Sequence, residues 1–104
     1  MSKRLEMLEK LVASGKADSF TRYALALDYR TLGRIDDAIR VFEALREADA
    51  TYLPMYLMAG QTLTAASRSA QAAEWLEQGI GVARSRGDSK TLGELEAALE
   101  ATRS

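Results

Sequence analysis

Apolar residues recur at helical spacing along the whole chain, and short turns interrupt them. This spacing is typical of amphipathic helices that bury one face. It predicts six helices, at residues 2–13, 19–32, 36–48, 53–66, 70–85 and 89–102. No stretch alternates apolar and polar residues with an enrichment in β-branched residues, so no strand is expected. The predicted fold class is therefore all-α.

Residues that favour helix ends flank these segments. Asp18 or Ser19 can cap the second helix, and Asp88 can cap the last one. Gly15 suits a left-handed cap after the first helix, and Gly33 ends the second. The helix bounds therefore follow from local chemistry as well as from periodicity.

Apolar stripes indicate which face each terminal helix buries. The stripe of the first helix is Leu5, Leu8, Leu11 and Val12. The last helix has one narrow apolar edge, formed by Leu92, Leu95 and Leu99. A helix that is apolar on one side only is typical of the end of a stack of helices.

The middle of the chain repeats itself after 34 residues. Ala38-x3-Phe42 follows the turn at Gly33, and Ala72-x3-Leu76 follows the equivalent turn at Ser67. The helix before each turn carries a related motif, which is Arg22-x2-Leu25-Ala26-x2-Tyr29 in the first copy and Tyr56-x2-Ala59-Gly60-x2-Leu63 in the second. The period therefore predicts a stack of helical hairpins.

These motifs resemble the pattern W-x2-L-G-x2-Y…A-x3-F…P of the tetratricopeptide repeat family. The resemblance covers nearly the whole chain, although Arg22 replaces the aromatic residue and both copies lack the closing proline. It implies a small bacterial-type member of the family with a short helical-hairpin solenoid fold. The implied single domain comprises a half repeat at 1–18, full repeats at 19–52 and 53–86, and a capping helix at 87–104.

The resemblance also implies where a partner binds. In this family the first helix of each hairpin lines a concave groove that holds an extended peptide or a helix. The matching positions here are unusually apolar, and they are Phe20, Tyr23, Ala24, Leu27, Arg30, Leu57, Met58, Gln61 and Thr64. For Leu27 and Met58, contact with a neighbouring helix inside the core is an equally open alternative. Tyr23, Leu27 and Met58 stand where some members carry Lys and Asn to grip a C-terminal carboxylate, which argues against that ligand.

Two features bear on packing inside the second repeat. Gly60 is expected at the closest approach of two helices, and Gly79, which matches Leu45, at a close helix contact. Gly81 has no such explanation. The Trp75 side chain is expected to be half-buried and to pack within the fold rather than to anchor an interface.

Charged residues are scarce in the middle of the chain. The charged residues within residues 50–83 are Arg68, Glu74 and Glu77, and the helix at 53–66 has no charged residue. Either this helix is covered on both sides, or its open face meets a partner or a second copy. The second possibility gives an alternative function, which is a self-associating structural domain that forms a homodimer through the same charge-poor surface.

Composition narrows the class of function. The 104-residue chain has a net charge of −1, so no basic surface for nucleic acid or anionic lipid is expected. It has no Cys and no His, so neither a metal site nor a cofactor nor an activated nucleophile is expected. The carboxylates of Asp36–Asp37 and Glu94/Glu96 are assigned to a helix start and a solvated face. The sequence therefore predicts a cytoplasmic, non-enzymatic scaffold that binds a protein or peptide, and neither nucleic acid nor a membrane.

Overall fold

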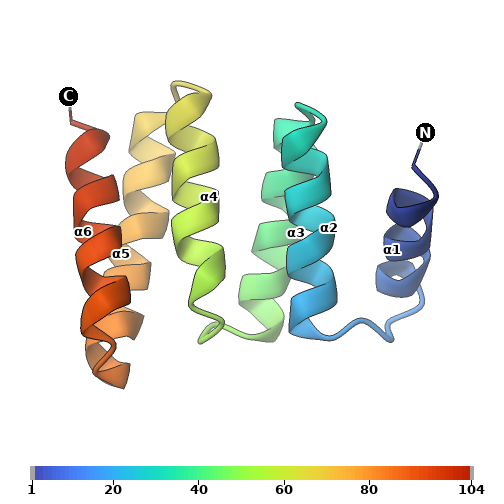
Figure 1. Ribbon diagram of the computed structural model, residues 1–104, viewed down its shortest axis with the longest axis horizontal. Coiled ribbons are helices and arrows are strands. Elements are labelled where there is room, and N and C mark those ends of the chain that lie inside the picture. The colour runs from blue at the N-terminus through green and yellow to red at the C-terminus, as the bar shows by residue number, and fades with distance from the viewer. Residues whose placement is uncertain (1, 104) are drawn as a thin grey trace. The chain divides into compact units, whose positions relative to one another are not determined.

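The computed structural model describes residues 2–103, which form six helices and no strand (Figure 1). The helices are α1 (Lys3–Ala13), α2 (Ser19–Thr31), α3 (Ile35–Ala48), α4 (Pro54–Ala65), α5 (Ser69–Arg86) and α6 (Ser89–Ala101). The all-α prediction is confirmed. Each helix begins and ends within one residue of its predicted bounds, because periodicity and capping both act locally.

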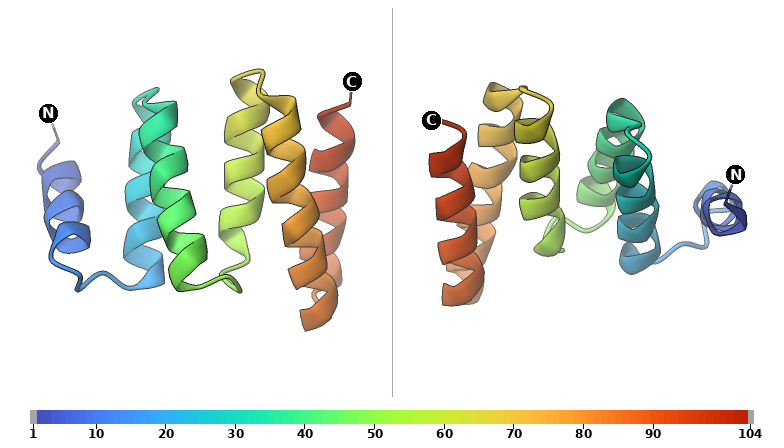
Figure 2. Two further views of the ribbon diagram at one scale, coloured as in Figure 1. Left: turned by 180° about the vertical axis from the view of Figure 1, so that it is seen from behind. Right: turned by 45° about the horizontal axis from the view of Figure 1, so that its top comes forward.

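The helices divide into two compact units, one ending at Ala50 and the other beginning at Thr51. In the first unit α2 packs against both α1 and α3, and in the second α5 packs against both α4 and α6. Figure 2 shows the pairs α2–α3 and α4–α5 as hairpins joined by tight turns. The sequence-based division of one domain into repeats stays a prediction.

Capping side chains fix three helix starts. Ser2 accepts a hydrogen bond from the backbone N–H of Leu5 at the start of α1. Asp18 caps α2 and Asp88 caps α6 in the same way, each at its third residue. Of the two predicted candidates for α2, the cap is therefore Asp18, while the Ser19 hydroxyl donates to Asp49 at the end of α3.

Left-handed backbone ends the first helix of each hairpin. Gly33 has φ +76° after α2, and Ser67, 34 residues later, has φ +61° after α4. The next residue in each case donates its N–H five residues back, from Arg34 to Tyr29 and from Arg68 to Leu63. The two turns are therefore the same C-capping motif, and Ser67 adopts a conformation that favours glycine.

Close helix contacts shape the core of the second unit. A Cβ added to Gly60 would lie 2.4 Å from Cδ2 of Leu76, so α4 and α5 approach too closely there for a larger residue. A Cβ at Gly79 would lie 2.6 Å from Cβ of Tyr56. The structure thus gives both glycines the packing role that the sequence predicted. A Cβ added to Gly81 would meet no atom of another helix within 4 Å, so Gly81 remains without a packing role.

Two burial predictions need correction. Trp75 is only 4% exposed rather than half-buried. Its ring packs against Tyr56, and the centroids of the two rings are 6.1 Å apart. Leu11 is 38% exposed although its stripe neighbours Leu5 and Leu8 are buried. Among the described helices α1 packs against α2 alone, so only one side of α1 is covered and Leu11 keeps part of its surface in water.

Candidate functional site

The predicted binding residues of the first unit share one face of α2. This helix turns Leu25, Ala26 and Tyr29 toward the interior of its unit. Phe20 and Arg30 on the other side are exposed, and Phe20 is the most exposed large apolar side chain among the described residues, at 66%. The face therefore offers an aromatic ring to solvent near the start of α2 and a guanidinium group near its end.

Two other residues of this face belong partly to the core. Tyr23 is half-buried, and its ring centroid lies 6.4 Å from that of the fully buried Phe42. Leu27 is also half-buried. Both side chains therefore contribute to packing within the unit and keep part of their surface open.

The predicted binding residues of the second unit share the outward side of α4. Gln61 is exposed, whereas Leu57, Met58 and Thr64 are half-buried. The Thr64 hydroxyl donates to the backbone oxygen of Gly60 at 2.8 Å, so its hydrogen-bonding capacity is largely used inside the helix. The surface that α4 offers to a ligand is thus mainly the apolar side chains of Leu57 and Met58 and the side-chain amide of Gln61.

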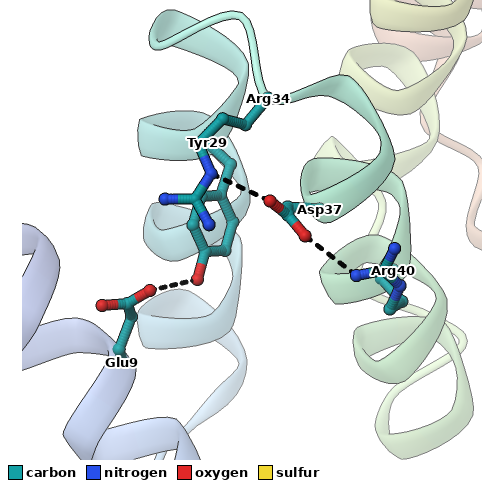
Figure 3. A network of polar contacts seen from close by, with 5 residues as sticks. All are labelled: Glu9, Tyr29, Arg34, Asp37 and Arg40. Carbon is teal, nitrogen blue, oxygen red and sulfur yellow. Dashed lines mark hydrogen bonds and ion pairs between the residues drawn. The ribbon is translucent and has the colours of Figure 1, made fainter.

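A polar network that the sequence did not predict joins the three helices of the first unit (Figure 3). The Tyr29 hydroxyl of α2 donates to a carboxylate oxygen of Glu9 on α1, at 2.5 Å. The Arg34 guanidinium lies 4.5 Å from the centre of the Tyr29 ring and donates to Asp37 of α3. Arg40 donates to the other oxygen of Asp37. These contacts tie α1 to the α2–α3 hairpin.

The network shifts the acidity of its members. Burial and the bond to Glu9 raise the pKa of Tyr29 to about 12. The hydrogen bond from Arg34 lowers the pKa of Asp37. The raised pKa of Tyr29 favours its protonated hydroxyl, and the lowered pKa of Asp37 favours its ionised carboxylate, which are the forms that these two contacts require.

The acidic side chains of the described residues do not form a further chemical site. No three acidic side chains within residues 2–103 gather closely enough to hold a metal ion. The side chains of Glu94 and Glu96 are exposed, as a solvated helix face requires. None of the described helices has both the length and the apolar content that crossing a membrane demands.

Comparison with known proteins gave similar folds among solved structures. One is the solution structure of a tetratricopeptide repeat domain protein from Salinibacter ruber, with a TM-score of 0.75, 36% identity, and coverage of 82% of this chain and 86% of that chain. A crystal structure of a domain from the same organism gives a TM-score of 0.74 and 36% identity, covering 83% of this chain and 97% of that one. A protein from Bordetella parapertussis is 29% identical, with a TM-score of 0.82 and coverage of 99% and 90%. No protein-family model and no curated protein matches the chain.

Proposed function

Because this chain belongs to the tetratricopeptide repeat family, we propose that it is a non-catalytic module that binds a peptide segment or a helix of another protein. The family likeness confirms the resemblance predicted from the repeat motifs. Members of this family serve in general as protein-interaction scaffolds. The proposal for this chain adds the mode of binding, which is apolar contact with the outward faces of α2 and α4, each within its own unit.

The observation that carries the proposal is the exposure of Phe20. The 66% exposed phenyl ring leaves apolar surface in water, and on the same face of α2 this surface continues into the half-buried side chains of Tyr23 and Leu27. An apolar stripe of this kind favours an interaction site more than an isolated exposed residue does. The α4 face adds Leu57 and Met58 on a helix without a charged residue, so a docking partner displaces no ionised group there. The proposal keeps the predicted repeat division and cytoplasmic location, and it includes neither nucleic acid nor a membrane as partner.

Capture of partners from the native lysate tests the proposal one face at a time. Phe20→Glu on α2 and Leu57→Glu on α4 each place a charge that must be desolvated when an apolar partner docks. Each change should therefore reduce the amount of the main captured protein by at least about tenfold.

The matched control is Leu32→Glu, because Leu32 is also a large apolar residue, 56% exposed, in the first unit but outside the predicted face. It should leave capture unchanged, and the helical circular dichroism of all three variants should equal that of the parent. Undiminished capture by both face variants would contradict the proposal.

A self-associating domain is the second candidate, favoured by the uncharged surface of α4. In this case Leu57 and Met58 would contact a second copy rather than another protein. Light scattering over a dilution series separates the two functions. A mass that falls with dilution in the parent, and stays monomeric in the Leu57→Glu variant, supports the homodimer.

A further inference from the structure

The outward face of α1 is a second apolar surface, outside the binding faces of α2 and α4. Met7 is 56% exposed and Leu11 is 38% exposed, one helical turn apart. They line a shallow hollow of about 610 Å³ together with Lys3, Glu6, Lys10, Ser14 and Lys16. Two adjacent large apolar side chains in such a hollow are more than the scattered exposure that every surface shows.

The repeat register indicates what normally covers this face. Met7 and Leu11 lie 68 residues, or two periods, before Trp75 and Gly79 of α5. In the second unit both of these positions contact Tyr56 of α4, the first helix of the hairpin. The positions that α1 leaves open are thus the ones that α5 packs against a preceding helix through an aromatic side chain.

The charges around the hollow indicate which kind of partner segment would bind there. Lys3, Lys10 and Lys16 surround the two apolar side chains, and Glu6 is the one acidic residue of the lining. Within residues 2–103 none of these three lysines forms an ion pair. The rim therefore carries a surplus of two positive charges that an acidic partner would neutralise.

We propose that the outward face of α1 binds an amphipathic helix of a partner protein, with a large apolar side chain seated on Met7 and Leu11 and acidic residues facing the lysines. The bound helix takes the place that a hairpin's first helix occupies in the second unit. The lining of this site shares no residue with the binding faces of α2 and α4.

The probe is a synthetic peptide with the sequence of residues 53–66, which keeps Tyr56 as its apolar anchor. In the acidic form, glutamate replaces the four residues that flank the anchor's face, which are Leu57 and Thr64 on one side of the helix and Thr62 and Ala66 on the other. In the basic form, lysine replaces the same four. Fluorescence anisotropy of each labelled peptide, titrated with the full chain at low ionic strength, gives the two affinities.

The acidic peptide should bind at least about tenfold more tightly than the basic one. Lys3→Glu with Lys10→Glu should reverse that preference. Met7→Ser with Leu11→Ser should weaken binding of the acidic peptide by about tenfold, since both changes remove exposed apolar contacts without disturbing the core. Leu32→Ser is the matched control and should change nothing.

Several results would overturn the proposal. One is equal affinity of the parent for both peptides, or no binding of either up to about 1 mM. Another is weakening by Phe20→Ser in place of the Met7 and Leu11 changes, which would assign the peptide to α2. A third is a parent dimer in sedimentation that Met7→Ser with Leu11→Ser makes monomeric, because a second copy would then be the occupant.

Discussion

Gly60 and Gly81 offer a matched test of the packing between α4 and α5. Both are helical glycines of the second unit, and the same substitution, to alanine, can be made at each. At Gly60 the new methyl group would lie 2.4 Å from Cδ2 and 2.5 Å from Cγ of Leu76, whereas at Gly81 it meets nothing within 4 Å. The two variants therefore share the gain in helix propensity and differ in steric strain.

The magnitudes follow from these two terms. Replacing a helical glycine by alanine stabilises a helix by about 1 kcal/mol. Leu76 is fully buried, so the overpacking at Gly60 should cost about 1–3 kcal/mol. Gly81→Ala should raise the unfolding free energy by about 1 kcal/mol. The unfolding free energy of Gly60→Ala should be about 1–3 kcal/mol lower than that of Gly81→Ala.

Urea and thermal melts, followed by helical circular dichroism, measure this difference. One kcal/mol corresponds to about 4–8 °C in Tm for a domain of this size, so the separation is easily resolved. The Gly60→Leu variant, with a larger side chain, should be less stable still. Equal stability of Gly60→Ala and Gly81→Ala would refute the close approach of α4 and α5, and with it the repeat register.

Three further predictions concern a turn, the polar network and the final helix. Ser67→Gly should raise the unfolding free energy by about 1 kcal/mol in urea melts, and Gly33→Ser should lower it by a similar amount, since both positions have positive φ. The pKa of Tyr29 is about 12 in the folded chain against the ordinary 10, so the protonated hydroxyl contributes stability that is fully present below pH 10 and is lost between about pH 10 and 12. The unfolding free energy measured across this pH range should show the loss in the parent and not in Tyr29→Phe. Leu95→Ala should cost about 2–5 kcal/mol in thermal melts, because this side chain is fully buried.

The helices could be predicted from the sequence because their determinants are local. Asp18 and Asp88 lie within a few residues of the amide groups that they cap, and the apolar period is visible in any one helix. Gly60 could be assigned through the repeat, which places equivalent residues in equivalent contacts. The exposure of side chains was harder to predict. Leu11 has the same spacing as the buried Leu5 and Leu8, and its exposure depends on how many helices pack against α1.

The exposure of the predicted binding residues could be predicted from the sequence for some of them and not for others. Register alone placed Phe20 and Gln61 on outward faces, and both are exposed. The contact of Tyr23 with Phe42 joins residues 19 positions apart, and no local pattern predicts it. The same holds for the hydrogen bond between Glu9 and Tyr29, which depends on how α1 lies against α2.

NMR can locate directly the surface through which the apolar outward faces of α2 and α4 would bind a protein segment. The ¹⁵N-labelled chain would be titrated with a peptide from the main protein captured in the lysate experiment. The largest chemical-shift changes are expected around Phe20 and Leu27 in α2 and around Leu57 and Gln61 in α4. Changes confined to residues of α3 and α5, with α2 and α4 unaffected, would contradict it.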